Sequence, residues 1–305
     1  MRPADGRRPA RVVSVGRNSA WIAFEDEEHV RLAAFRKNVE RLTLVPGDLV
    51  SATPLDDERV VIDGREPRSF ALERTTAGGR TRTMAANIDG IAIVAALVRP
   101  PLHRAMIDEL LAFAAIFGLN ARLIFTKADL VADEGETAAI IALYRDLGYE
   151  VLGANPRSGE GLAAVEAAFA GRHTLLIGQS GVGKSSLFGA LGGRADVGDV
   201  SKTGRGKQTT TTGRLHRFAP GGFLIDSPGV GDFALQDCTP QQIALGFVEF
   251  ATRAAACRFS DCTHRSEPGC GVVAAVQNGR IARGRYASYR AILERDLPGD
   301  AGRGD

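Results

Sequence analysis

The fold is decided by one stretch, Gly178-Gln179-Ser180-Gly181-Val182-Gly183-Lys184-Ser185, which matches the phosphate-binding pattern G-x4-G-K-[S/T] in full. The apolar run His173–Ile177 leads into it, and Ser186–Leu191 can leave it as a helix. The glycines let successive backbone N–H groups face phosphate oxygens, and the helix N-terminus adds a partial positive charge. We therefore expect residues 178–186, including Ser186, to bind a nucleoside triphosphate, with Lys184 at the β- and γ-phosphates and Ser185 on Mg²⁺.

Two later segments complete the expected phosphate and magnesium site. Asp226-Ser227-Pro228-Gly229 follows the strand-like run Gly222–Ile225, so Asp226 would contact Mg²⁺ indirectly and the Gly229 N–H would meet the γ-phosphate. Between the two motifs, the glycine and threonine run Gly204–Thr212 suits a mobile switch. We expect Thr210 within this run to approach Mg²⁺ when the γ-phosphate is present.

A base-reading motif comes earlier in the chain. Thr126-Lys127-Ala128-Asp129 closes the strand-like run Arg122–Phe125 and resembles N-K-x-D, with threonine in place of asparagine. Asp129 can accept hydrogen bonds from N1–H and the 2-amino group of guanine, whereas adenine lacks that amino group and has a lone pair at N1. Two charge-assisted bonds predict at least about a hundredfold preference for guanine. The loop Ala154–Gly161 would pack beside the base.

The order of these motifs indicates a circular permutation, because the guanine-reading loop precedes the phosphate-binding loop and Asp226 comes last. Strand-like and helix-like runs alternate between residues 88 and 177, which predicts an α/β domain with a parallel sheet covered on both faces. The loops at the carboxyl edge of such a sheet can form one pocket although the chain termini have moved. The expected fold is a circularly permuted P-loop GTPase domain, and the expected ligands are GTP or GDP with Mg²⁺.

The segments before this domain predict a small barrel. Short β-type runs separated by turn residues occur at 11–15, 21–24, 30–35, 49–53 and 59–62. An OB-fold fits this spacing, and an SH3-like barrel fits nearly as well. Residues 73–87 are polar and glycine-containing, which predicts a linker. The predicted domains are an OB-fold-like RNA-binding barrel over 1–72, the GTPase domain over 73–238 and a zinc-binding helical domain over 239–305.

The last of these domains contains the pattern Cys257-x4-Cys262-x-His264-x5-Cys270. Three cysteines and a histidine at this spacing suit tetrahedral zinc, and no position is left open for water, so we expect one structural ion per chain. The fourth cysteine, Cys238, lies outside the pattern. Helical patterns at 242–256 and 286–296 surround the cluster.

Composition narrows the class of protein. The 305 residues are 44% hydrophobic and 24% charged, with a net charge of +2, and no apolar run approaches the roughly 20 residues that span a bilayer. The start of the chain has no apolar secretory segment, so we expect a soluble, cytoplasmic protein without a membrane partner, and a monomer. Basic clusters near the N-terminus, around 202–217 and near the C-terminus favour a polyanionic partner.

The motif order, the preceding barrel and the run from Cys257-Arg258-Phe259-Ser260-Asp261-Cys262-Thr263-His264 through Glu267-Pro268-Gly269-Cys270 resemble the bacterial small-ribosomal-subunit-dependent GTPase A family. Ala86-Asn87-Ile88-Asp89 is similar to that family too, and the resemblance covers roughly residues 10–295. It implies a late-stage assembly factor that binds rRNA of the small ribosomal subunit and whose GTP hydrolysis that subunit stimulates. The chain departs from the family at Gln208, where histidine is common, and at Thr126.

Intrinsic hydrolysis is expected to be slow, because Val230 follows D-x-x-G where Ras-like enzymes place a water-orienting glutamine. Two other functions fit the motifs. One is a nucleotide-dependent RNA-binding switch in which hydrolysis is incidental. The other is a small-molecule or nucleic-acid kinase, which Asp129 disfavours.

Overall fold

The computed structural model divides the backbone into two compact units. The first comprises residues 1–89, 156–177 and 184–230, and the second comprises 90–155, 178–183 and 231–305. The residues that the structure describes are 6–27, 29–36, 43–57, 59–75, 81–191, 214–218, 221–226, 235 and 238–296. The expected switch run 204–212 with Thr210, together with Gly229 and Val230, lies outside these residues.

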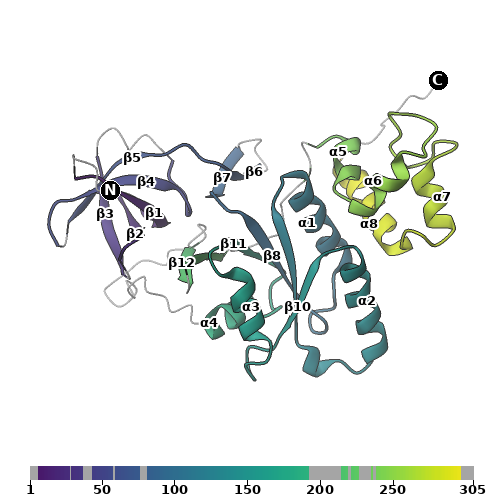
Figure 1. Cartoon of the computed structure of the whole chain (residues 1–305), viewed down its shortest axis with the longest axis horizontal. Coiled ribbons are helices and arrows are strands. Elements are labelled where there is room, and N and C mark those ends of the chain that lie inside the picture. The colour runs from purple at the N-terminus through teal and green to yellow at the C-terminus, as the bar shows by residue number, and fades with distance from the viewer. Residues whose placement is uncertain are drawn as a thin grey trace. The chain divides into compact units, whose positions relative to one another are not determined.

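The first unit opens with a closed barrel, drawn in purple in Figure 1. Its strands are β1 (Arg8–Val15), β2 (Ser19–Phe24), β3 (Val30–Phe35), β4 (Leu49–Pro54) and β5 (Val60–Arg65), in the order β1-β2-β3-β5-β4. Neighbouring strands are antiparallel except β3 and β5, which are parallel. Alternate side chains such as Val12, Ile22 and Ile62 fill the interior at 0% exposure. The predicted five-stranded barrel is confirmed.

A hairpin follows where a linker was predicted, so that prediction was wrong. Strands β6 (Ala71–Thr75) and β7 (Thr81–Ala86) pair antiparallel, with Leu72 opposite Ala85. Both of these side chains are 1% exposed, so the segment buries apolar surface despite its polar composition. Gly47 packs against the end of β7, since a Cβ there would lie 2.0 Å from the Ala86 carbonyl oxygen. Polar composition alone does not predict such close packing of backbone segments.

Among the described residues, the rest of the first unit forms three strands and two helices. Strand β13 (Gly222–Asp226) pairs parallel with β11 (His173–Ile177) and antiparallel with β12 (Arg214–Phe218). Helices α3 (Leu162–Phe169) and α4 (Lys184–Ala190) belong to the same unit. Arg11 of the barrel lies over the ring of Phe223 at 5.4 Å from the centroid and donates a hydrogen bond to the Gly47 carbonyl. This contact ties the barrel to the strand that ends at Asp226.

The second unit holds three parallel strands in the order β10-β9-β8. Strand β8 (Gly90–Ala96) is buried along its whole length, as its apolar sequence predicts. Strands β9 (Asn120–Thr126) and β10 (Glu150–Ala154) follow α1 (Arg104–Ile116) and α2 (Glu134–Asp146). The register places Ala96 and Ala154 on either side of Thr126, so the carboxyl ends of all three strands are level. The predicted strand–helix alternation is confirmed.

The C-terminal segment folds into short helices that belong to the second unit: α5 (Pro240–Leu245), α6 (Val248–Ala254), α7 (Gly271–Gln277) and α8 (Arg283–Asp296). In Figure 1, α5 and α8 lie beside α1. The helical pattern predicted over 242–256 forms two helices, α5 and α6, because the chain turns at Gly246 and Phe247. A Cβ at Gly246 would approach Ala112 of α1 to 2.8 Å, so close packing on α1 sets the break. Among the described residues, no helix is long and apolar enough to cross a membrane.

Candidate nucleotide site and metal cluster

The phosphate-binding loop begins with a close backbone approach. A Cβ at Gly178 would lie 2.1 Å from the carbonyl oxygen of Val94 in β8, so only glycine fits this position. Gly181 and Gly183 have φ angles of 80° and 101°, in the region that favours glycine. Helix α4 then starts at Lys184, so the loop leads into a helix N-terminus as the motif requires. Lys184, Ser185 and Ser186 occupy its first turn.

The loop predicted to read guanine is hydrogen-bonded directly to the loop predicted to bind phosphate. The Thr126 hydroxyl, which is 1% exposed, donates a 2.6 Å hydrogen bond to the carbonyl of Val182. The Lys127 ammonium donates to the carbonyl of Gly181 at 2.7 Å and also to the carbonyl of Arg99. Lys127 adopts a left-handed conformation, with φ of 60° and ψ of 33°. Two segments more than fifty residues apart in sequence are therefore held in one geometry.

Asp129 follows in a single 3₁₀ turn, Ala128–Leu130, and is exposed. Its Oδ1 accepts a 3.2 Å hydrogen bond from the side-chain amide of Asn155, which stands just after β10. The loop 154–161, predicted to pack beside the base, thus contacts the carboxylate that is predicted to read the base. The motif alone does not show this contact, because it depends on the pairing of β9 with β10.

The structure places Asp226 at the same level as the end of β11. Asp226 is the last residue of β13 and pairs with Leu176, which precedes Ile177 by one residue. Because the two strands are parallel, this register brings the carboxyl ends of β11 and β13 to one edge. The side chain of Asp226 and the residues 227–234 lie outside what the structure describes.

The predicted metal ligands are gathered in one place. One potential ligand atom from each of Cys257, Cys262, His264 and Cys270 lies within 4.8 Å of the others. The Sγ atoms of Cys257 and Cys270 are 3.9 Å apart, and both lie near His264 Nδ1, at 3.5 and 3.4 Å. In tetrahedral zinc with bonds of about 2.0 to 2.3 Å, ligand atoms are separated by about 3.5 to 3.8 Å. The donor set and its spacing fit such an ion.

Backbone and side-chain hydrogen bonds support the cluster. The N–H groups of Gly271 and Val273 donate hydrogen bonds to the sulfurs of Cys257 and Cys270, which holds these two side chains in place. Burial lowers the pKa of His264, which favours the neutral imidazole that binds metals. Burial would raise the pKa of Glu267, but hydrogen bonds led by the Thr263 hydroxyl and including backbone N–H donors lower it to about 2. This carboxylate therefore fixes the loop between the ligands.

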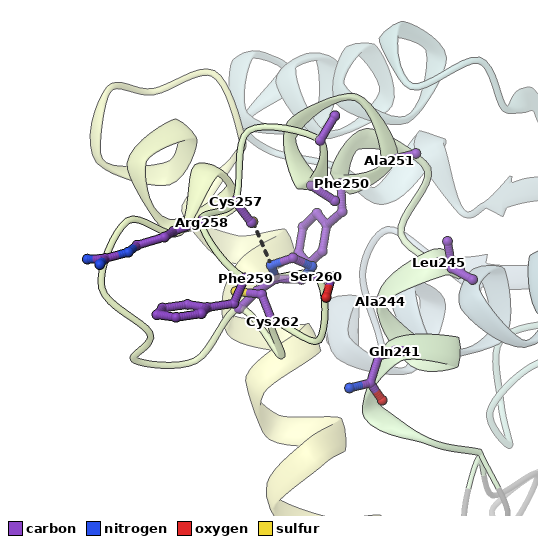
Figure 2. A pocket seen from close by; sticks show the side chains of 13 residues that line it. Gln241, Ala244, Leu245, Phe250, Ala251, Cys257, Arg258, Phe259, Ser260 and Cys262 are labelled. Carbon is purple, nitrogen blue, oxygen red and sulfur yellow. Dashed lines mark hydrogen bonds between the residues drawn. The ribbon is translucent and has the colours of Figure 1, made fainter.

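A pocket of about 510 Å³ opens beside the cluster. Figure 2 shows the residues that line it: Ala244 and Leu245 of α5, Phe250 of α6, and Phe259 from the loop between Cys257 and Cys262. Leu245 and Phe259 are 69% and 41% exposed, so part of this apolar lining faces solvent.

Sequence reasoning missed a buried charge cluster that joins α1 to the C-terminal helices. Arg285 of α8 contacts Asp108 of α1 at 2.8 Å and Glu249 of α6 at 2.7 Å. Tyr144 and Ser288 donate to the same Asp108 carboxylate at 2.8 and 2.6 Å. Burial alone would lower the pKa of Arg285, but the two carboxylates raise it above its usual value. No motif signals these residues, since Asp108 and Arg285 are far apart in sequence.

Known proteins with similar sequences share a single description. A family model described as RsgA GTPase matches residues 65–236. The curated protein "Small ribosomal subunit biogenesis GTPase RsgA" of Ectopseudomonas mendocina is 41% identical over 262 residues, which is 84% of this chain and 76% of that protein. The protein of the same name from Azotobacter vinelandii is 42% identical over 255 residues, covering 82% of this chain and 74% of its own length.

Solved structures agree in fold. The crystal structure of YjeQ from Thermotoga maritima is similar with a TM-score of 0.78 and 30% identity, over 96% of this chain and 99% of that one. YloQ, described as a circularly permuted GTPase, gives a TM-score of 0.75 at 23% identity, over 98% of this chain and 100% of its own. The predicted permuted fold is thereby confirmed. Matching motifs, fold and sequence lead to one conclusion: the chain belongs to the RsgA GTPase family.

Proposed function

We propose that this GTPase binds guanine nucleotides in one pocket made by residues 126–129 and 178–186, and acts in the cytoplasm in biogenesis of the small ribosomal subunit. The observation that carries the pocket is the pair of bonds from Thr126 to Val182 and from Lys127 to Gly181, at 2.6 and 2.7 Å. A base read by Asp129 and phosphates held by the glycine loop are then parts of a single ligand.

Each predicted site residue has a role in this proposal. The N–H groups of 178–183 and the side chain of Lys184 hold phosphate oxygens, and Ser185 ligates Mg²⁺. Asp226 supports the ion from the end of β13, and Gly229 offers its N–H to the γ-phosphate. Thr210 approaches Mg²⁺ when that phosphate is present. The small subunit supplies or orders the group that positions the attacking water, since Val230 cannot do so by hydrogen bonding.

The proposed role on the ribosome rests on the relatives, which are named as small ribosomal subunit biogenesis GTPases. We propose that a monomer contacts rRNA through the barrel and the C-terminal helices, with three functional modules at 1–72, 73–238 and 239–305. Phosphate contacts of this kind weaken as salt rises. By holding the small subunit in place, these contacts would let it supply a catalytic group. A group supplied in this way can raise the rate of GTP hydrolysis by roughly 10³ to 10⁵.

The test is single-turnover hydrolysis of GTP by the protein alone, with small subunits and with large subunits, across a salt series. We expect slow hydrolysis alone and a large, salt-sensitive stimulation by small subunits only. Fast hydrolysis by the free protein that small subunits leave unchanged at low salt would refute the proposed role. Nucleotide-dependent binding to small subunits without stimulation would favour the switch in which hydrolysis is incidental.

We also propose that the Cys257, Cys262, His264 and Cys270 cluster holds one structural zinc ion. The fit of the donor spacing to a tetrahedron supports this proposal. Freshly purified, unchelated protein should contain about one zinc per chain by metal analysis. A metal content near zero would contradict the assignment.

A further inference from the structure

Two large apolar side chains stay exposed at the pocket beside the cysteine cluster. Leu245 of α5 is 69% exposed, and Phe259 of the loop between Cys257 and Cys262 is 41% exposed. In Figure 2, Phe259 lies to the left of the buried ring of Phe250 and Leu245 lies to its right. Single exposed leucines are ordinary on protein surfaces, whereas apolar side chains gathered around a pocket mark an interaction site. This pocket is therefore a candidate docking surface.

The rest of the apolar lining is made mostly of small side chains. Ala244 of α5 and Ala251, Ala254 and Ala255 in and after α6 line the pocket together with Phe250. Alanine offers apolar surface without filling the space, and about 510 Å³ is left open. A large apolar side chain that enters from outside would therefore be buried against apolar surface on several sides, which is favourable.

Hydrogen bonds fix the walls of this pocket. The side-chain amide of Gln241 in α5 donates to the carbonyl of Asp261 at 3.2 Å, which joins α5 to the loop between Cys257 and Cys262. The backbone N–H of Arg258 donates to the carbonyl of Gly269 at 3.0 Å, which ties the start of the same loop to its far end. Because the walls are already ordered, less conformational entropy is lost when a partner docks.

The charge at the pocket comes from Arg258. This residue is exposed, and its guanidinium carbon lies 5.5 Å from the centroid of the Phe259 ring. Among the described residues that line the pocket, Arg258 is the only lysine, arginine, aspartate or glutamate. One arginine suits a single carboxylate beside an apolar anchor, whereas RNA is held through several phosphate contacts. The apolar lining and the single cation together favour a protein segment over RNA.

We propose that this pocket docks a protein segment of the small ribosomal subunit. The segment inserts a large apolar side chain between Leu245 and Phe259 and pairs a carboxylate with Arg258. The inference rests on the proposed function and adds a protein contact to the rRNA contacts proposed there. Aromatic and arginine side chains contribute most of the affinity at many protein interfaces, so Phe259 and Arg258 should matter most.

The first measurement is equilibrium binding of the full chain, loaded with a non-hydrolysable GTP analogue, to purified small subunits. Phe259→Ala should weaken binding at least about fivefold, the loss expected for an aromatic side chain at an interface. Phe259→Leu keeps an apolar wall and should retain most of the affinity, whereas stacking of an RNA base requires the aromatic face. Phe117→Ala removes a ring that is 47% exposed outside the pocket, and this matched control should bind like the parent.

The second measurement identifies what enters the pocket. A photoreactive phenylalanine analogue replaces Leu245, and the protein is irradiated together with small subunits. The cross-linked product should resist ribonuclease and contain peptides of a ribosomal protein by mass spectrometry. The same analogue at position 117 should not give that product.

Several results would overturn the inference. A thermal melt first shows that each variant is folded. Unchanged binding by Phe259→Ala, equal losses in Phe259→Ala and Phe259→Leu, a cross-link to RNA alone, or no cross-link would each contradict a docked protein segment. The unaltered protein tests the proposed function separately, through stimulation of its GTP hydrolysis by small subunits. Stimulation that persists while the pocket results fail refutes the docking alone, whereas a parent that neither binds small subunits nor responds to them refutes both.

Discussion

The predicted nucleotide loops and the C-terminal helices are each stabilised by a different kind of contact. Around residues 126–129 and 178–183, side chains of one loop bond to backbone carbonyls of the other, with Thr126 and Lys127 as donors. Among the C-terminal helices, side chains contact one another, as Arg285 does with Asp108 and Glu249 and as the predicted metal ligands do. Backbone-based contacts tolerate change at the partner residue, whereas side-chain clusters fail when one member is lost.

The largest effect should follow loss of the metal cluster. In Cys262→Ala the remaining ligands can no longer enclose the ion, so the C-terminal helices should unfold while GDP still binds. Cys238→Ala, outside the cluster, is the matched control. Zinc content, a thermal melt and GDP titration measure these outcomes. A variant that keeps the zinc and the melting curve of the parent would contradict the assigned ligands.

The next largest effect should come from the buried charge cluster. Arg285→Ala leaves Asp108 and Glu249 as uncompensated buried carboxylates, which should lower the free energy of unfolding by about 3–5 kcal/mol. The side chains of Arg285 and Asp108 are only 1% and 2% exposed, so solvent cannot replace the lost partner. Urea unfolding measures the change.

A control for that variant lies on the same two helices. Arg295 of α8 pairs with Glu109 of α1, but the Arg295 side chain is 53% exposed. Exposed pairs contribute about 0–1 kcal/mol, so Arg295→Ala should change the unfolding free energy far less than Arg285→Ala. Similar losses of unfolding free energy in the two variants would contradict the expectation that the buried ion pair contributes more stability than the exposed one.

A smaller effect, on GDP binding, is expected from losing the single hydrogen bond between the Thr126 hydroxyl and the Val182 carbonyl. Thr126→Val removes the hydroxyl and leaves the Val182 carbonyl without that donor, which should weaken GDP binding by about five- to tenfold. Thr126→Ser keeps the hydroxyl and should bind almost as well as the parent. Isothermal titration with GDP measures the affinities of the two variants. Equal affinity of Thr126→Val and the parent would show that this bond does not fix the loop.

The same contrast explains what the sequence could predict. The glycine loop and its helix were predictable because Gly181 and Gly183 adopt positive φ angles and Gly178 packs against a backbone carbonyl, which only glycine allows. The ligand cluster was predictable because Cys257 to Cys270 are close in the chain. The contacts of Asp108 with Arg285 and of Asp129 with Asn155 were not, because they depend on packing between distant segments. The hairpin at 71–86 was missed because the segment is polar in composition although Leu72 and Ala85 are buried.

Asp129 and the glycine loop are proposed to bind one ligand, with the base at Asp129 and the phosphates at the loop. Xanthine carries a carbonyl where guanine has its 2-amino group, so an amide at position 129 should favour it. The decisive measurement is single-turnover hydrolysis of GTP and of xanthosine triphosphate by Asp129→Asn and by the parent. We expect the variant to lose GTP hydrolysis at subsaturating nucleotide by at least about a hundredfold and to gain activity on xanthosine triphosphate. Unchanged preference for GTP in the folded variant would contradict the shared pocket.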